Sequence, residues 1–295
     1  MTIRRTPLLP AALLAVAVLA TACAPADEET TATSPSPTTS SETVDRCAKE
    51  NLQTFSPGEL TIATDQPVFE PWFVDDDPTN QQGFEGAAAY AIAEQLGYSA
   101  DEVTWVRVPF NAAIQPGPKT FDFDINEFSI TEERREAVDF SSPYYDVSQA
   151  VITIGSSPAA DATSLADLKD LKIGAQVGTT SFDVIEAVIA PNTKPAVFNT
   201  NDDAKKALEN GQIDALVVDL PTAFFITAAE LDDGKIVGQL ESPEGEQEQF
   251  GLVLDKNSPL TECVSEAVDA LRADGTLDQL VDEWLSQAGG APVLS

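Results

Sequence analysis

The stretch Ser129-Ile-Thr-Glu-Glu-Arg134, followed closely by Val138-Asp-Phe-Ser-Ser-Pro-Tyr-Tyr145, constrains the architecture more than any other part of the chain. Before it, Phe121 to Ile125 reads as a strand, and a helix is expected to begin after Thr131. Ser129 and Arg134 therefore lie where a strand turns into a helix. Hydroxyl and free backbone N–H groups at such a junction can bind an anion. The planar guanidinium of Arg134 can add two parallel hydrogen bonds to a carboxylate.

Short apolar strands alternate with amphipathic helices on both sides of this stretch, which indicates an α/β fold with mainly parallel sheets. A first block runs from the strand at Leu60 to Ala63 to the helix after Thr131. A second block of the same order follows the segment Gln149 to Ile154. Its predicted elements are the strand Lys172 to Gln176, the helices Ser181 to Ile189 and Asp202 to Glu209, and the strand Ala215 to Val218. The tail adds the strand Phe250 to Leu254 and the helices Leu260 to Ala273 and Leu277 to Ser286.

Two blocks with a returning tail predict two lobes, of which the first is discontinuous. We expect lobe 1 to comprise residues 45–150 and 250–295, and lobe 2 to comprise residues 151–249. Two strands would then cross between the lobes, near Ala150 and near Gln249. Two such crossings make a hinge, and the cleft between the lobes is the natural place for a ligand.

The first residues are typical of an export signal. Arg4 and Arg5 precede an apolar run from Leu8 to Ala20, which is too short for a bilayer span of about 20 residues. We expect residues 1–22 to be a signal peptide. Cys23 directly after it resembles the cysteine of a bacterial lipobox, which is lipidated, although plain secretion is an alternative. Residues 23–44 would then be a lipidated cysteine and a Ser/Thr/Pro-rich tether.

Two cysteines remain after Cys23. Cys47 and Cys263 form an even pair, and in an oxidising compartment this predicts a disulfide. Such a bridge would connect the start of the folded region to a C-terminal helix and stabilise the fold by about 4 kcal/mol. The alternative is two free buried thiols.

The composition excludes several kinds of function. The 295 residues carry 16 Lys and Arg against 49 Asp and Glu, a formal charge of −33, which repels nucleic acid. The sequence contains no histidine, so a Ser-His-Asp or Cys-His nucleophile and a His-ligated metal are excluded. We expect no nucleic-acid partner, no metal and no cofactor.

From Gly58 to Leu285 the chain resembles the polar amino-acid-binding proteins of ABC importers, which are solute-binding proteins of family 3. The stretches that carry the resemblance are the two quoted above together with Leu60-Thr-Ile-Ala-Thr-Asp65, Phe69-Glu-Pro-Trp72, Gly83-Phe-Glu85, Phe121-Asp122, Val177-Gly-Thr-Thr-Ser181 and Val218-Asp219. The resemblance implies a two-lobed periplasmic-binding-protein type 2 fold, often called a Venus flytrap. It also implies a protein that is not an enzyme, captures an amino acid outside the cytoplasm, and delivers it to an ABC permease. We expect a monomer anchored to the cell membrane by its lipid.

The resemblance also implies roles for individual residues. An amino acid presents a carboxylate and an ammonium group, and both need charged partners when they leave water. By resemblance, Arg134 clamps the carboxylate, Ser129 contacts ligand backbone groups, and Thr180, at the start of a helix, donates its amide to the same carboxylate. Asp219 ends the strand Ala215 to Val218 and accepts the ammonium group. Taken alone, Arg134 would read as a surface charge, Thr180 as a helix cap and Asp219 as a turn residue.

Three further positions match the sides of the ligand pocket. Phe69 and Phe110 match aromatic residues that sandwich the ligand, and Asp65 matches a position that can meet the ligand's side chain. Without the resemblance, these would be two core aromatics and a turn carboxylate. Glu127 is a departure, since related proteins usually have a small residue there. If Glu127 faces the cleft, it and Asp65 favour a cationic or polar amino acid.

Two other functions stay open on the sequence. The same fold hosts dehydratases that act on cyclohexadienyl or arogenate substrates, and Glu127 or Asp65 could serve as the general acid. A ligand-sensing module is the other alternative, in which any signal would pass through a separate partner.

Overall fold

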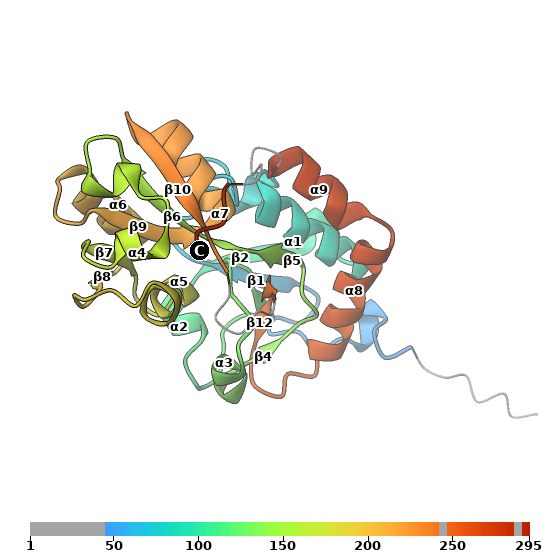
Figure 1. Ribbon diagram of the computed structural model, residues 1–295. Helices are drawn as coiled ribbons and strands as arrows, with labels where there is room; N and C mark the ends of the chain where they lie inside the picture. Colours follow the sequence, from blue (N-terminus) through green and yellow to red (C-terminus); the bar gives the residue numbers. More distant parts are fainter. Residues whose placement is uncertain (1–44, 242–246, 286–290) are drawn as a thin grey trace, which may run out of the picture. The chain divides into compact units, whose positions relative to one another are not determined.

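The computed structural model describes residues 45–241, 247–285 and 291–295. The predicted signal peptide, the lipidation of Cys23 and the tether lie outside these residues. The described residues belong to one compact unit, which contains two five-stranded sheets (Figure 1). Within the described ranges, no helix has both the length and the apolar character needed to cross a bilayer.

The first sheet has the strand order β2-β1-β3-β12-β4. Its strands are β1 (Leu60–Thr64), β2 (Val103–Arg107), β3 (Phe123–Asp124), β4 (Asp139–Phe140) and β12 (Val253–Leu254). The helices α1 (Phe84–Gln95), α8 (Thr261–Ala273) and α9 (Thr276–Trp284) pack on one another and share an apolar core with β1. The short helices α2 (Phe110–Ala113) and α3 (Glu132–Ala137) belong to a smaller core around Phe128 and Phe140.

The second sheet has the strand order β10-β6-β9-β7-β8. Its strands are β6 (Gln149–Ile154), β7 (Ile173–Gln176), β8 (Ala196–Phe198), β9 (Ala215–Asp219) and β10 (Gly234–Leu240), and its helices are α4 (Leu165–Leu168), α5 (Thr180–Val184), α6 (Asn201–Glu209) and α7 (Leu220–Phe225). Alternate residues of β9 enter different cores: Val217 lies in one, and Leu216 and Val218 lie in the other. Burial on both faces explains the continuous apolar run of this strand.

Shorter elements complete the fold. They are the 3-10 helices η1 (Lys49–Asn51), η2 (Pro78–Asn80), η3 (Ala100–Glu102) and η4 (Pro158–Asp161), and the π-helical turns η5 (Ile185–Ile189) and η6 (Ile226–Glu230). The turns η5 and η6 continue α5 and α7, so the helix predicted from Ser181 to Ile189 changes from α to π at Ile185.

The prediction of mainly parallel sheets is wrong, because both sheets are mixed. β1 runs parallel to β2 and β3, but β12 is antiparallel to β3 and β4. In the second sheet, β7 is parallel to β8 and β9, whereas β6 is antiparallel to β9 and β10. A buried strand is equally apolar in either direction, so the local pattern does not reveal its orientation.

Two strands connect the sheets. β5 (Tyr145–Val147) leads into β6 of the second sheet, and β11 (Glu248–Phe250) leads back into β12 of the first. They pair antiparallel as a separate two-stranded ribbon, with Gln249 opposite Asp146. The two crossings therefore lie next to each other, close to the positions expected from the sequence.

The last residues do not lie where we expected them. We assigned all of residues 250–295 to lobe 1, but Val293 pairs with Gln239 of β10, and Leu294 is buried in a core of the second sheet. Gly238 makes this close approach possible, because a Cβ atom there would lie 2.6 Å from the carbonyl oxygen of Pro292. The last residues therefore lie against the second sheet.

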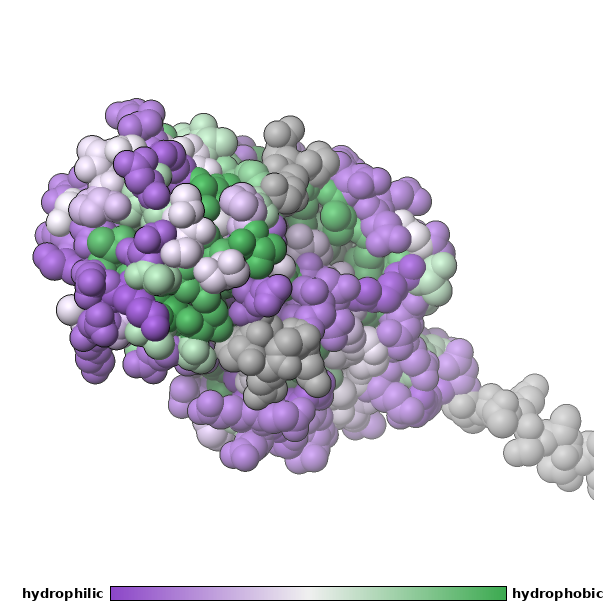
Figure 2. Space-filling model, viewed as in Figure 1, coloured by the Kyte–Doolittle hydropathy of each residue, from purple (hydrophilic) through white to green (hydrophobic). Residues whose placement is uncertain are grey.

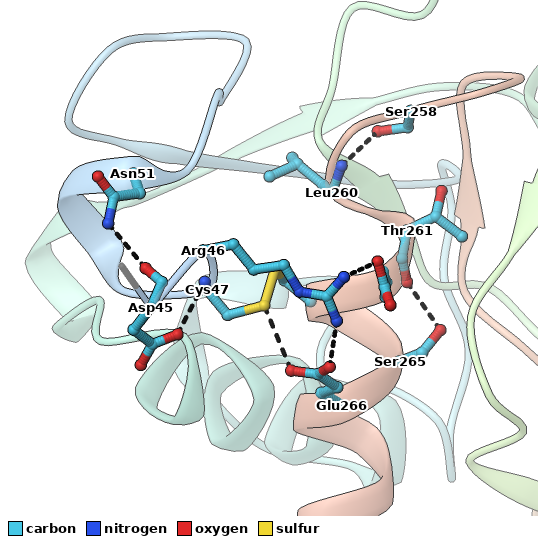
Figure 3. Close-up of a disulfide and its surroundings, with 11 residues drawn as sticks. Asp45, Arg46, Cys47, Asn51, Ser258, Leu260, Thr261, Ser265 and Glu266 are labelled. Carbon is cyan, nitrogen blue, oxygen red and sulfur yellow. Dashed lines mark hydrogen bonds and ion pairs between the residues drawn. A yellow bond between two sulfur atoms is a disulfide. The ribbon is translucent and has the colours of Figure 1, made fainter. Parts of the chain in front are cut away.

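A disulfide joins Cys47 to Cys263 of α8 (Figure 3). The neighbouring Arg46 pairs with Glu262 and Glu266 on the same helix, and all three side chains are more than half exposed. The bridge thus holds the first described residues against α8, as the cysteine pair predicts.

The visible surface is largely hydrophilic, as the acidic composition leads one to expect (Figure 2).

Candidate functional site

One cavity collects all the binding residues predicted from the sequence. It has a volume of about 60 Å³, and its wall combines residues that follow β1 and β3 with residues that follow β7 and β9. The predicted residues that line it are Asp65, Phe69, Phe110, Glu127, Ser129, Arg134, Thr180 and Asp219. Gln149, Gln176, Ser181 and Asn201, which we did not predict, also line it. Glu127, whose orientation the sequence left open, therefore faces the cavity.

Arg134 spans the two sides of this cavity. Thr131 caps helix α3 by accepting a hydrogen bond from the Arg134 N–H at 3.1 Å, which fixes the backbone below the guanidinium. Nη1 donates to the carbonyl oxygen of Ser129 at 2.7 Å, and Nη2 donates to that of Gly178 at 2.9 Å. Within the described residues, no carboxylate oxygen lies within 4.0 Å of the guanidinium nitrogens.

A guanidinium has five N–H donors and stays charged in proteins. Burial lowers the pKa of Arg134, whereas the charges of Glu248 and Asp183 at longer range raise it. The guanidinium carbon also lies 5.5 Å from the centre of the Phe110 ring, in a cation–π arrangement. Arg134 thus keeps N–H donors and a positive charge that a carboxylate in the cavity would satisfy.

Glu248 of the β11 ribbon organises the hydroxyl groups beside Arg134. Its Oε1 accepts hydrogen bonds from Ser129 Oγ and from Thr180 Oγ1, each at 2.6 Å. The side-chain amide of Gln149 donates to the same carboxylate, at 3.1 Å to Oε2, and Ser181 Oγ donates to the amide oxygen of Gln149 at 2.6 Å. Each hydroxyl has a single hydrogen, so Ser129 and Thr180 direct theirs at Glu248.

The start of α5 adds backbone donors. Gly178 has a φ of 75°, and a Cβ atom there would lie 2.3 Å from Asn111 Oδ1, so this turn requires glycine. The first N–H groups of a helix have no partner inside the helix. Thr180 therefore brings both a hydroxyl and a backbone N–H to the wall that Arg134 shares.

The opposite end of the cavity is acidic. Asp219 caps α7 by accepting from the Thr222 N–H at 3.1 Å, and the Thr222 hydroxyl contacts Glu127 Oε2 at 3.2 Å. Glu127 has a φ of 52° and its N–H donates to Glu85 Oε1 at 2.7 Å. Burial, followed by the charges of Asp219 and Glu85, raises the pKa of Glu127 well above its usual range. Burial likewise raises the pKa of Asp219.

More carboxyl groups lie behind this end. Burial raises the pKa of Glu85 to about 8, although the hydrogen bond that the Tyr144 hydroxyl donates to it opposes the shift. Asp124 on β3 is fully buried, and neither of its carboxyl oxygens has a hydrogen-bond partner among the described residues. Burial and the charges of Glu85 and Asp65 raise the pKa of Asp124 well above its usual range.

Asp65 and the aromatic residues form the remaining wall. Asp65 Oδ2 accepts from the Phe110 N–H at 3.1 Å, and burial raises the pKa of Asp65. Phe110 is only 7% exposed and stacks on Phe128 with ring centres 4.7 Å apart. Phe110 is thus a core aromatic and a cavity residue at once, while Phe69 is partly exposed at the cavity wall.

The match to a protein family is decisive. The model of the bacterial extracellular solute-binding proteins, family 3, matches residues 60–287. The chain belongs to this family.

This family 3 protein is similar in sequence to one curated relative, and in sequence and structure to two ancestral proteins of solved structure. It is 29% identical over 225 residues to a probable histidine-binding protein of Campylobacter jejuni, covering 74% of this chain and 82% of the relative. It is 32% identical to the solved structure of an ancestral arginine-binding protein bound to arginine, with a TM-score of 0.64, covering 77% of this chain and 98% of the other. An ancestral amino acid-binding protein that is a precursor of cyclohexadienyl dehydratase is 28% identical, with a TM-score of 0.64, covering 77% and 95%.

These matches establish the two-lobed fold of the family 3 protein. Sequence reasoning had missed Glu248, Gln149 and Thr222, which hold the predicted residues in place. Glu248 could have been found, because it directly precedes the predicted crossing at Gln249. Every second side chain of a strand faces the same side, so one of these two neighbours had to face the cleft.

Proposed function

We propose that this protein captures an amino acid between its two lobes, outside the cytoplasm, and delivers it to an ABC permease. The observation that carries the proposal is that Arg134, from the first lobe, and Asp219, from the second, line the same cavity. These opposite charges match the two charged ends of an amino acid. Burying a zwitterion is costly unless both of its charges find partners.

In the proposed complex, the ligand carboxylate binds the remaining N–H groups of Arg134 and the backbone N–H groups at the start of α5. The hydroxyls of Ser129 and Thr180 already donate to Glu248. They therefore contribute mainly to the shape of the cavity beside Arg134, where the ligand carboxylate binds. The ammonium group binds Asp219, and Phe69 and Phe110 contact the aliphatic part.

The ligand class that we propose is a cationic or polar amino acid. Asp65, Glu127 and Asp219 all line the cavity, so its acidic end favours positive charge. The similarity to a histidine-binding relative and to an arginine-bound structure supports the same class. Micromolar affinity would correspond to about −8 kcal/mol.

We further propose that lobe 2 comprises residues 151–249 together with residues 291–295, and that the rest of the folded chain forms lobe 1. The protein would act as a monomer with Cys23 as its lipid anchor and residues 1–22 as its signal peptide. The export signal and cysteine of the sequence support this part of the proposal.

A thermal-shift assay with each common amino acid tests the function. A ligand present at a hundredfold excess over its Kd adds about 2.7 kcal/mol of stability, so the melting temperature should rise clearly with at least one of them. Arg134→Ala should abolish the rise. Arg135→Ala is the matched control, because Arg135 lies on the same helix and is exposed. A rise that persists in Arg134→Ala would contradict the assigned role of Arg134.

An enzyme on this fold is the second candidate. Its support is the similarity to the precursor of cyclohexadienyl dehydratase and the raised pKa of Glu127, which suits a general acid. We propose that the protein is not an enzyme, and incubation with prephenate and with arogenate tests this. Formation of the dehydrated product would favour the enzyme over the binding protein.

A further inference from the structure

The carboxyl groups of Glu127 and Asp219 come from different sheets and meet around Thr222. Glu127 follows β3 of the first sheet, Asp219 ends β9 of the second, and both line the same cavity. The Thr222 hydroxyl donates to Glu127 Oε2 at 3.2 Å, and the Thr222 N–H donates to Asp219 Oδ1 at 3.1 Å. A hydrogen-bonded bridge between two carboxyl groups requires a hydrogen on one of them, because an ionised carboxylate is only an acceptor.

The surrounding donors are already used. Trp72 Nε1 donates to Thr222 Oγ1 at 2.7 Å, and an indole N–H is only a donor. The Thr222 hydroxyl must therefore direct its own hydrogen at Glu127 Oε2, while the Thr222 N–H donates to Asp219 Oδ1. Neither of these hydrogens lies between the two carboxyl groups.

The charged and titratable groups around the pair do not supply a cation. Glu85 on α1 accepts a hydrogen bond from the backbone N–H of Glu127, and Tyr144 donates to Glu85. Burial and, from the ribbon, the charge of Glu248 raise the pKa of Asp219, while burial and, to a smaller extent, the charge of Asp219 raise the pKa of Tyr145. Among the described residues, no Lys or Arg nitrogen lies within 4.0 Å of either carboxyl group of the pair. Lys205, which shares a neighbouring pocket with Glu127, pairs with Asp202 and Glu230 at 2.9 and 3.0 Å.

Two carboxylates that line one small cavity and share the same Thr222 disfavour each other's ionisation. The pair therefore needs one positive charge. Either a proton or the ammonium group that we propose binds Asp219 can supply this charge. The proton and the ammonium group would both lie between the two carboxyl groups.

We propose that a proton and the cationic group of the ligand compete for the Glu127–Asp219 pair, so that binding of the amino acid expels one proton. This inference rests on the proposed function. In the exchange, the carboxylic O–H bond breaks, its proton passes to the solvent buffer, and the ammonium group donates hydrogen bonds to both carboxylates. The affinity should then rise up to tenfold for each unit of pH until the pair is deprotonated, and level off above that point.

Calorimetry with L-arginine at pH 6.5, in phosphate and in imidazole, measures the exchange because the two buffers take up protons with different heats. The wild-type protein should release about one proton per bound arginine. Glu127→Gln should release none, because its amide supplies the bridging hydrogen and Asp219 then stays ionised. Glu209→Gln is the matched control, since Glu209 is exposed on α6, and it should release the same proton as the wild type. Arginine binding without proton release, or equal release in Glu127→Gln, overturns the proposal.

Infrared spectroscopy of the ligand-free protein tests the bridge without any ligand. The wild type at pH 6.5 should show a protonated-carboxyl C=O band that Glu127→Gln lacks and that Glu209→Gln retains. The absence of this difference overturns the proposal. If the band difference is present but no amino acid binds, it is the proposed function that fails, and the competition fails with it.

Discussion

The hydroxyl oxygens of Ser129 and Thr180 lie 3.1 Å apart, although one residue follows β3 of the first sheet and the other begins α5 beside the second. Both hydroxyls contact the same oxygen of Glu248, which belongs to neither sheet but to the ribbon between them. Three separate segments thus meet at one carboxylate, and the contact depends on its negative charge.

We expect Glu248→Ala to lower the free energy of unfolding by about 1.5–3 kcal/mol, because it leaves the donors of Ser129, Thr180 and Gln149 without their charged acceptor. Glu248→Gln should lower the free energy of unfolding by less, since the amide oxygen of Gln can still accept hydrogen bonds. Urea denaturation measures both values. Glu209→Ala, which removes an exposed carboxylate of α6, should change the free energy by no more than about 0.5 kcal/mol. A Glu248→Ala value as small as this control would contradict the assignment.

The bond between Trp72 and Thr222 also crosses between the lobes. Both residues are buried, at 1% and 5% exposure, so Thr222→Val should cost about 1–3 kcal/mol by leaving the indole N–H without an acceptor. A double-mutant cycle with Trp72→Phe isolates the pair, and we expect a coupling energy of about 1 kcal/mol from the two single and the double variants. Additive effects would show that the two side chains act independently.

The buried carboxyl groups predict an unusual dependence of stability on pH. The pKa of Glu85 is about 8 in the folded protein, against a usual value of 4.5, so the folded state binds more protons than the unfolded state between these values. The stability from Glu85 is therefore complete below about pH 4.5 and is lost as the pH rises through 8. Asp124 and Glu127 shift in the same direction.

We expect the ligand-free protein to unfold at a higher urea concentration at pH 5.5 than at pH 8.5. Glu102, whose pKa is lowered to about 2 by its bonds with Lys49 and Ser99, changes charge only in more acidic solution and does not affect this window. Glu85→Gln keeps an acceptor for Tyr144 and should flatten the dependence. An unchanged slope in Glu85→Gln would rule out Glu85 as its main source.

The disulfide predicts a loss of stability under reducing conditions. Cys47 and Cys263 are separated by 216 positions, so their bridge restricts most of the unfolded chain. We expect reduction, or the double substitution of both residues by Ser, to lower the free energy of unfolding by about 2–5 kcal/mol. Urea denaturation with and without a thiol measures the loss. Equal midpoints in the two conditions would contradict it.

The sequence predicted the layout of the fold and the grouping of the candidate residues around one cavity better than the contacts among them. Most helices and strands have local patterns, and Thr131 and Gly178 mark their boundaries with side chains or backbone angles that only a few residue types provide. Strand β10 was not predicted, since its sequence Gly-Lys-Ile-Val-Gly-Gln-Leu has two glycines and no regular alternation. The direction of β12 depends on how it enters the sheet between β3 and β4, and the local sequence does not specify this.

The acidic end shows the same limit. Glu127 stood out because its charge breaks a local pattern, but its partners Asp219 and Thr222 lie more than 90 positions away along the chain. The Trp72–Thr222 bond spans 150 positions. Such pairings depend on how the two lobes close on each other, which no segment specifies by itself.

The ribbon of β5 and β11 has a mechanical consequence. Glu248 and Phe250 are adjacent alternate residues of a strand that joins the lobes, and one supplies the carboxylate at Ser129 while the other lines the cavity. A bend in this strand must move Phe250 and with it part of the cavity wall. Conversely, a movement of this part of the wall must move the strand. The connection between the two sheets is therefore itself part of the cavity wall, with no intervening residues between them.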